Sequence, residues 1–178
     1  DLKTGSDTEL LLKLYVSEKE QCIQNLDGMF GFAVLDQSDK SIVFARDFMG
    51  RIPLYYYMID KKIVIASELK SITHSLGINA SEVEIVEPGC YYNFDYETGH
   101  LQKTQFYSFP DANIIDDMTE DVITTNIKTL LSSAVDNELI SDVPVCTILS
   151  GGVDSTIITY LLSKRISNLQ AFVVSMGD

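Results

Sequence analysis

The stretch Leu149-Ser150-Gly151-Gly152-Val153-Asp154-Ser155 is a glycine-rich turn between two apolar segments. The residues before it, Val143–Leu149, predict a buried-type strand, and Ser155–Arg165 after it predict a helix. A second strand is expected at Ala171–Met176. A strand, turn, helix and strand within about 30 residues predict a βαβ unit with parallel strands. One such unit cannot cover both faces of a parallel sheet, so we expect it to begin a larger α/β domain.

The composition of this turn is typical of an anion-binding loop. Gly151 and Gly152 let the backbone approach a ligand closely and take positive φ values. Ser150, Ser155 and Thr156 add hydroxyl groups, and the following helix directs its unpaired N–H groups at the same point, so a phosphate is the expected occupant. The turn is not a Walker A loop, because the G-x-x-x-x-G-K-[ST] spacing is absent. The alternative is a tight turn whose glycines serve only packing, which the full S-G-G-x-D-S string disfavours.

The first 110 residues follow a different pattern, in which short strands predominate. Ser6 and Glu9 have capping-box spacing and predict a helix over Asp7–Val16, and a second helix is expected at Ser67–Leu76. Alternating and β-branched runs bounded by turn residues predict strands at Phe30–Leu35, Ser41–Ala45, Leu54–Ile59, Ile63–Ala66, Cys90–Asp95 and Leu101–Tyr107.

The character of the chain changes near Pro110. Residues Pro110–Asp117 are mostly polar and acidic and predict a linker. Thr119, followed by two acidic residues, is expected to cap a helix with an apolar stripe that extends to Leu139. The sequence therefore predicts one domain over residues 1–110 and a second that starts at residue 111.

Charge and cysteine usage restrict the partners and the compartment. The 178 residues include 13 basic and 26 acidic side chains, a net charge of −13, which argues against a nucleic acid or an anionic membrane as partner. No apolar run approaches the ~18 residues of a membrane helix. Cys22, Cys90 and Cys146 are widely spaced and predict buried free thiols in a reducing compartment, hence the cytoplasm. His74 and His100 stand alone, so no zinc site is expected.

Two sets of motifs resemble known protein families. Ser150–Ser155 resembles the pyrophosphate-binding loop of the N-type ATP pyrophosphatases. Stretches similar to class II glutamine amidotransferases are Asp27–Ala33, Ala45–Tyr56, Ala66–Ile72 and Glu87–Gly89. The amidotransferase stretches followed by the pyrophosphatase loop, over nearly the whole chain from Gly5 to Gly177, resemble the arrangement of the glutamine-hydrolysing asparagine synthetases.

This resemblance implies a fold and a reaction. Residues 1–110 would form an antiparallel, layered α+β glutaminase domain of the Ntn-hydrolase type that lacks its N-terminus. Residues 111–178 would begin a parallel-sheet α/β ATP-pyrophosphatase domain. The parent enzyme would use ATP and Mg²⁺ to adenylate aspartate and amidate it with ammonia from glutamine, releasing AMP and pyrophosphate. A homodimer is compatible with the resemblance, and the sequence leaves the oligomeric state open.

The resemblance also carries over site residues. Asp7 matches the carboxylate that pairs with the α-amino group of glutamine. Its alternative role is to stabilise the helix through a favourable interaction with the helix dipole, worth about 0.3–1 kcal/mol. Asp154 would stand near the Mg²⁺ that bridges to the departing pyrophosphate. Arg46-Asp47 and Ser67-Glu68 match family motifs, but for Asp47 and Glu68 an ion pair that holds strand ends is the preferred interpretation. The ATP-binding residues implied by the resemblance are Leu149, Ser150, Gly151, Gly152, Asp154, Ser155 and Val174, with Leu149 and Val174 beside the adenosine.

The chain departs from the family pattern at its start. The family nucleophile is an N-terminal cysteine whose own amine acts as base, whereas this chain begins with Asp1, and Cys22 is expected on a solvent-side segment outside any motif. We therefore expect a fragment with no catalytic residue of its own and no activity alone. Two alternatives stay open: a β-lactam-forming or peptide-cyclising synthetase, which needs no ammonia, and a catalytically inactive homologue.

Overall fold

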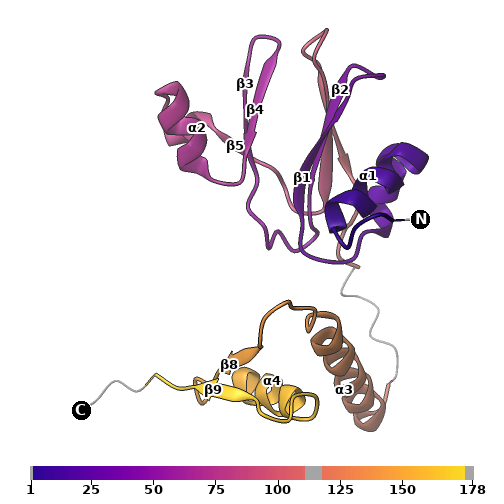
Figure 1. The fold of residues 1–178 in the computed structure, drawn as a ribbon, viewed down its shortest axis with the longest axis vertical. Helices are drawn as coiled ribbons and strands as arrows, with labels where there is room; N and C mark the ends of the chain where they lie inside the picture. Colours follow the sequence, from indigo (N-terminus) through magenta and orange to yellow (C-terminus); the bar gives the residue numbers. More distant parts are fainter. Residues whose placement is uncertain (1, 111–117, 175–178) are drawn as a thin grey trace. The chain divides into compact units, whose positions relative to one another are not determined.

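A computed structural model of the chain describes residues 2–110 and 118–174 (Figure 1). The chain divides into two compact units, Asp1–Pro110 and Asp111–Asp178, and each unit is described by itself. The predicted linker over Pro110–Asp117 falls, apart from Pro110, outside the described residues.

The first unit is built from two antiparallel sheets with helices outside them (Figure 1). Helix α1 (Asp7–Glu18) continues into a 3-10 helix, η1 (Lys19–Asn25), and α2 (Leu69–Leu76) is followed by η2 (Ala80–Glu82). One sheet has the order β1 (Gly31–Asp36), β2 (Ser41–Arg46), β6 (Cys90–Asp95), β7 (Leu101–Gln105). The other has the order β4 (Lys62–Ala66), β3 (Tyr55–Ile59), β5 (Glu84–Ile85).

Strand β2 lies at the centre of this unit because its two faces enter two different cores. Phe44 belongs to a buried cluster with Leu54, which directly precedes β3, whereas Val43 and Ala45 belong to a second cluster with Tyr15 of α1. The alternation follows from the two-residue period of a strand. The order helix, sheet, sheet and helix confirms the predicted antiparallel, layered α+β fold.

The segment after α1 corrects the expectation for Cys22. The sequence placed Cys22 on a solvent-side segment, although it also predicted a buried thiol. Its side chain is 0% exposed, so the solvent-side placement is wrong and the buried free thiol is confirmed. The side chains of Cys22 and Ile23 in η1 are buried and belong to one core cluster with Val43 and Ala45 of the sheet. Cys90 is buried as expected, whereas Cys146 is exposed, contrary to the expectation of a buried thiol.

The second unit confirms the predicted βαβ arrangement. It contains α3 (Glu120–Asn137), β8 (Cys146–Ile148), α4 (Val153–Ser163) and β9 (Gln170–Phe172). Strands β8 and β9 pair in parallel, with Thr147 opposite Ala171. Arg165 ties the two helices together by binding the Asp136 carboxylate and the carbonyl oxygen of Ser132.

Three details of this unit differ from the expectations. The strand expected at Val143–Leu149 covers only Cys146–Ile148 and is mostly exposed. Thr147 is buried, and its hydroxyl oxygen lies 3.1 Å from that of Thr159 in α4, whereas Ile148 is 71% exposed. The strand expected at Ala171–Met176 ends at Phe172, and Met176 lies outside the described residues. Thr119 holds the N-cap position of α3 but its hydroxyl makes no capping hydrogen bond.

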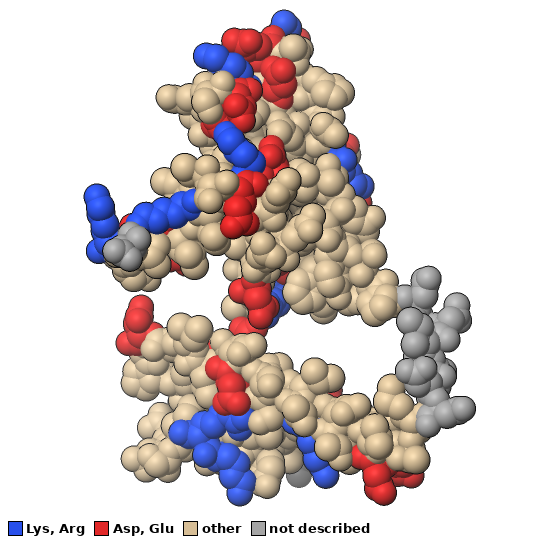
Figure 2. All heavy atoms as spheres, turned by 90° about the vertical axis from the view of Figure 1, so that its right-hand side faces the viewer, with Lys and Arg blue, Asp and Glu red and all other residues tan. Residues whose placement is uncertain are grey.

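The charged groups are mixed on the face of the molecule shown in Figure 2, where Lys and Arg side chains are scattered among Asp and Glu. Over residues 2–110 and 118–174, no helix combines the length and the apolar character that crossing a lipid bilayer requires.

Candidate functional site

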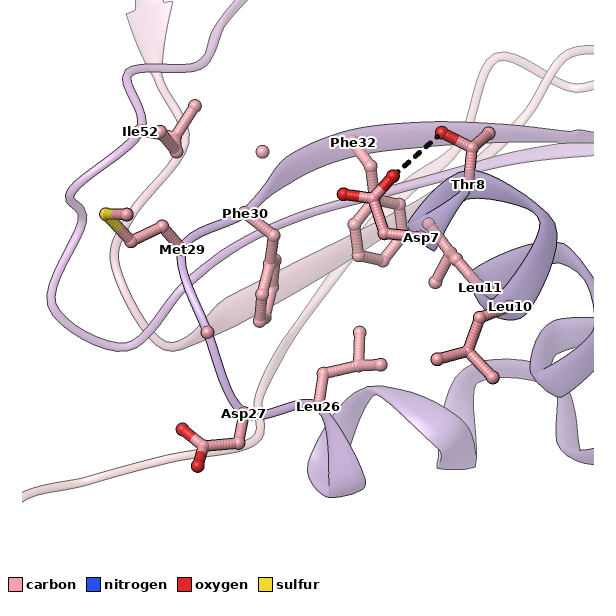
Figure 3. A pocket seen from close by; sticks show the side chains of 12 residues that line it. Asp7, Thr8, Leu10, Leu11, Leu26, Asp27, Met29, Phe30, Phe32 and Ile52 are labelled. Atoms are coloured by element: carbon pink, nitrogen blue, oxygen red, sulfur yellow. Dashed lines mark hydrogen bonds between the residues drawn. The ribbon is translucent and has the colours of Figure 1, made fainter. Parts of the chain in front are cut away.

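A pocket of about 510 Å³ opens between the first turn of α1 and the chain segment that leads into β1. Figure 3 shows the Asp7 carboxylate directed toward the space bordered by Phe30 and Ile52. Apolar side chains make up most of the lining. The lining residues are Asp7, Thr8, Leu10, Leu11, Leu26, Asp27, Gly28, Met29, Phe30, Gly31, Phe32 and Ile52.

The start of α1 leaves the Asp7 carboxylate available to a ligand. The Ser6 hydroxyl caps the helix by accepting a bond from the Thr8 N–H at 3.3 Å. Asp7 is exposed, and the one contact described for its carboxylate is a bond of 3.4 Å from the Thr8 hydroxyl. A carboxylate in this position is stabilised by the helix dipole and can accept an ammonium group at the same time.

The predicted capping box does not form, because Ser6 caps the helix through the Thr8 N–H and not through the Glu9 N–H. The Glu9 carboxylate accepts bonds from the Thr4 hydroxyl at 2.6 Å and the Lys3 N–H at 2.8 Å, instead of the Ser6 N–H. These two bonds and the neighbouring Lys13 lower the pKa of the Glu9 carboxyl to about 2. Glu9 thus fixes the chain before the helix and takes no part in the pocket.

The opposite wall of the pocket leaves little room for a side chain at Gly31. A Cβ atom on Gly31 would lie 3.0 Å from Cγ2 of Ile52, closer than ordinary van der Waals contact. The rings of Phe30 and Phe32, with centroids 5.5 Å apart, form an apolar surface beside it. The pocket therefore combines the carboxylates of Asp7 and Asp27 with an apolar wall, which suits a small zwitterion with an ammonium group and an aliphatic stem.

Asp47 and Arg46 bind backbone groups, whereas an ion pair at the strand ends is the expectation for Asp47 and Glu68; the Glu68 carboxylate lies 3.7 Å from the Lys70 ammonium. The buried Asp47 carboxylate accepts backbone N–H groups, and the Arg46 guanidinium donates to backbone carbonyl oxygens. Burial raises the pKa of Asp47, but the hydrogen bonds from the amides of Arg51, Ile52, Phe30 and Met49 together lower it below its usual value. The expected pairing is corrected because the irregular loop between Asp47 and Ile52 offers backbone partners to both side chains.

The glycine-rich turn of the second unit is open to solvent. Ser150, Gly151 and Gly152 are exposed, and a Cβ atom on Gly151 would meet no other group within 4 Å. Gly151 has φ +83°, which requires glycine for conformational reasons alone. No side chain caps the start of α4 at Gly152, so the first N–H groups of the helix remain available for an anion.

Hydroxyl groups surround this helix end. The Ser150 and Ser155 hydroxyl oxygens lie 3.0 Å apart. The Ser155 and Thr156 hydroxyls donate to the Gly152 carbonyl oxygen at 3.1 and 2.7 Å. Each hydroxyl has one proton, and those of Ser155 and Thr156 are used on this carbonyl oxygen, so the donors left for a ligand rich in acceptor oxygens are the backbone N–H groups of the turn.

Leu149 and Val174 follow the carboxyl ends of the two parallel strands. The Leu149 N–H donates to the Phe172 carbonyl oxygen at 2.8 Å, and Val174 is 83% exposed. The topology thus brings the two residues and the turn to the same edge of the sheet, where open α/β sheets bind ligands.

Asp154 stands exposed in the first turn of α4. Among the described residues, no group of three or more His, Cys, Asp or Glu side chains could hold a metal ion. One carboxylate nevertheless fits Mg²⁺, because this ion is commonly held by one or two carboxylates together with the phosphates of a nucleotide.

Sequence reasoning missed part of the first pocket. It identified Asp7 but assigned no role to Phe30 or Ile52, which line the same space. Both residues lie within the stretches Asp27–Ala33 and Ala45–Tyr56, so the motifs contained the signal without showing that they meet.

Comparisons with known proteins agree with both regions. The family model of the glutamine amidotransferase domain matches residues 1–97, and that of asparagine synthase matches residues 126–178. Asparagine synthetase [glutamine-hydrolyzing] 3 of Bacillus subtilis (strain 168) is 31% identical over an alignment 176 residues long that covers 86% of this chain and 28% of the relative. Asparagine synthetase B [glutamine-hydrolyzing] of Escherichia coli (strain K12) is 31% identical over 163 residues, 91% of this chain and 28% of the relative.

The chain thus spans less than a third of the length of these two relatives. A solved structure described as the allosteric regulatory enzyme of purine biosynthesis matches with a TM-score of 0.50 and 20% identity. The match covers 97% of the present chain and 39% of the chain in the solved structure, and it supports the fold alone. Because the amidotransferase model matches more than half of the residues, the chain belongs to the glutamine amidotransferase domain family, and the asparagine synthase match that follows confirms its resemblance to the glutamine-hydrolysing asparagine synthetases.

Proposed function

We propose that the chain is part of a glutamine-hydrolysing asparagine synthetase. In this reaction glutamine and water give glutamate and ammonia. The aspartate side-chain carboxylate attacks the α-phosphorus of ATP, forming aspartyl-AMP and releasing pyrophosphate. Ammonia then displaces AMP from the acyl carbon to give asparagine.

The observation that carries this proposal is the open turn between β8 and α4. Ser150, Gly151 and Gly152 are exposed, Ser155 is half-buried, and no side chain caps the start of α4, all at the carboxyl edge of a parallel strand pair. Donors in such an arrangement bind the polyphosphate of a nucleotide and stabilise charge that develops on a departing pyrophosphate. A glycine turn needed only for packing would instead be surrounded by neighbouring atoms, which Gly151 is not.

Each residue of the second site has a defined role in this proposal. Gly151 and Gly152 let the backbone N–H groups approach the β- and γ-phosphates. The hydroxyls of Ser150 and Ser155 would turn from their present partners within the turn to donate to phosphate oxygens. Asp154 would hold Mg²⁺, which supplies charge neutralisation to the pyrophosphate when bound. Leu149 and Val174 would contact the adenosine.

The Asp7 pocket is the proposed glutamine site. The carboxylate would bind the α-ammonium group, and the apolar wall formed by Phe30 and Ile52 would contact the methylene groups. Asp7 fixes the position of the substrate and exchanges no proton with it. The free thiols of Cys22, Cys90 and Cys146 support a cytoplasmic location, where thiols stay reduced.

The test is ATP–pyrophosphate exchange in the full-length protein. Asp154→Ala is expected to abolish exchange and to leave glutaminase activity unchanged. Asp142→Ala removes an exposed carboxylate of the same unit outside the turn and should leave both activities unchanged. Exchange that survives Asp154→Ala intact would contradict the phosphate role of the turn.

A further inference from the structure

The Asp47 carboxylate is a buried hub for the backbone around the Asp7 pocket. Its side chain is 0% exposed. It accepts hydrogen bonds from the N–H groups of Phe30 at 3.4 Å, Met49 at 3.1 Å, Arg51 at 3.0 Å and Ile52 at 3.2 Å. The Asp47 N–H in turn donates to the Phe30 carbonyl oxygen at 2.9 Å.

Arg46 holds the same loop from the other side. Its guanidinium donates to the carbonyl oxygens of Ile52 at 2.7 Å, Gly50 at 2.5 Å and Val86 at 3.1 Å. Ile52 is therefore bound by both neighbours, with its N–H on Asp47 and its carbonyl oxygen on Arg46. Two adjacent side chains thus fix one peptide segment in position and orientation.

Two of the four residues whose N–H groups bind Asp47, Phe30 and Ile52, line the pocket across from Asp7. Phe30 comes from the segment before β1 and Ile52 from the loop before β3, and both line the pocket opposite the Asp7 carboxylate (Figure 3). Ile52 also lies against the place where Gly31 has no side chain. Asp47 itself does not line the pocket. Its carboxylate determines how far this wall stands from Asp7.

We propose that Asp47 is a positioning residue for the ligand of the Asp7 pocket. By joining the amides of Phe30 and Ile52, it sets the distance between the ammonium-binding carboxylate and the wall that orients the rest of the substrate. This inference rests on the proposed function, in which that ligand is glutamine. A misplacement of about 1 Å can cost up to about 100-fold in rate, so small movements of this wall matter.

The charge of Asp47 supports this role. Four N–H groups require a carboxylate with both oxygens accepting, and an amide side chain offers one oxygen and an NH₂ group that would face other donors. Asp47→Asn therefore keeps the shape of the side chain and removes part of the hub.

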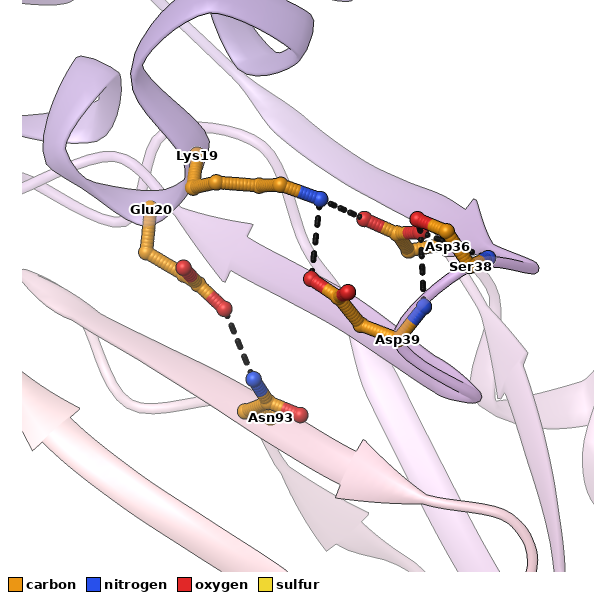
Figure 4. A network of polar contacts seen from close by, with 6 residues as sticks. All are labelled: Lys19, Glu20, Asp36, Ser38, Asp39 and Asn93. Carbon is orange, nitrogen blue, oxygen red and sulfur yellow. Dashed lines mark hydrogen bonds and ion pairs between the residues drawn. The ribbon is translucent and has the colours of Figure 1, made fainter.

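The experiment compares glutamine-dependent and ammonia-dependent asparagine formation in the full-length protein. Asp47→Asn is expected to raise KM for glutamine by about tenfold and to leave the ammonia-dependent reaction unchanged. The control is Asp36→Asn, which alters a buried carboxylate at the end of β1 that accepts the amides of Ser38 and Asp39 and pairs with Lys19, away from the pocket (Figure 4). This control is expected to lower the unfolding midpoint and leave KM for glutamine unchanged.

Gly31→Ala gives a second variant that does not depend on the folding of Asp47→Asn. Its added methyl group would press on Ile52 and displace the same wall, so KM for glutamine should again rise. An unchanged KM in a folded Asp47→Asn protein, or in Gly31→Ala if the former does not fold, would overturn the inference. Asp7→Asn separates the two proposals: if it also leaves KM unchanged, the glutamine site itself is wrong, whereas a raised KM for Asp7→Asn alone rejects only the positioning role.

Discussion

The ammonium nitrogen of Lys19 lies 2.5 Å from a carboxylate oxygen of Asp36 and joins the end of α1 to the turn between β1 and β2 (Figure 4). A second carboxylate, that of Asp39, lies 2.8 Å from the same nitrogen. The Lys19 backbone has φ +53°, a conformation that residues other than glycine rarely adopt. The contacts of the side chain therefore hold a strained backbone in place.

Two substitutions at Lys19 separate the contact from the strain. Lys19→Ala loses both ion pairs and keeps the unfavourable φ, whereas Lys19→Gly loses the pairs and accepts that φ freely. We expect Lys19→Ala to be less stable than Lys19→Gly by about 1 kcal/mol. Urea unfolding of the three proteins measures this difference, and equal stability of the two variants would show that the backbone carries no strain.

The same pair makes stability depend on acid. The Lys19 ammonium first, and then the Ser38 hydroxyl, hold the pKa of Asp36 far below its usual range. A carboxyl with a depressed folded-state pKa stabilises the fold above its unfolded pKa of about 3.9 and loses that contribution as the pH falls further. Unfolding free energy should therefore drop more steeply below about pH 4 in the natural protein than in Asp36→Asn. Parallel pH profiles would exclude this role.

Gly152 offers a variant in which stability and binding should move in opposite directions. Gly152 holds the N-cap of α4 with φ −78°, and a Cβ there would meet only the Ser150 hydroxyl, at 3.6 Å. Serine is a slightly better N-cap than glycine, so Gly152→Ser should leave stability unchanged or raise it by a few tenths of a kcal/mol. Its side chain would occupy the space proposed for phosphate, so the affinity for Mg-ATP should fall. Calorimetric titration and urea unfolding check both; unchanged affinity would count against the phosphate site.

The three cysteines should differ in reactivity. Burial raises the pKa values of the Cys22 and Cys90 thiols, and thiolate is the reactive form, whereas Cys146 is exposed. A native protein treated with a thiol-specific chromogenic disulfide should release one equivalent quickly, and Cys146→Ser should remove that phase. Three fast equivalents would contradict the burial of Cys22 beneath η1.

The sequence predicted the elements that have a clear period or a clear cap. The strand Cys90–Asp95 and the start of α1 at Asp7 agree with the structure, because alternation and an N-cap are local signals. The two-residue strand Glu84–Ile85 and the 3-10 helix at Lys19 were missed, because neither is long enough to show a period. Their positions depend on distant partners such as Tyr55.

The candidate sites divide in the same way. The turn at Ser150–Ser155 is contiguous, so its residue types could be interpreted directly from the sequence. The first pocket joins Asp7 to Phe30 and Ile52 through the fold, and the roles of Arg46 and Asp47 depend on backbone groups that no side-chain pattern reveals. Burial of Val143–Leu149 was overestimated, because an apolar composition does not show whether a partner covers both faces.

Titration of the isotope-labelled chain with Mg-ATP, followed through the backbone amide resonances, tests most directly whether the turn before α4 receives a nucleotide. We predict that the amides of residues 150–156 shift progressively and saturate, while those around Asp36 and Lys19 stay in place. If the amides of the turn do not move at any ATP concentration, or if the shifts gather elsewhere in the chain, the nucleotide site is not where we place it.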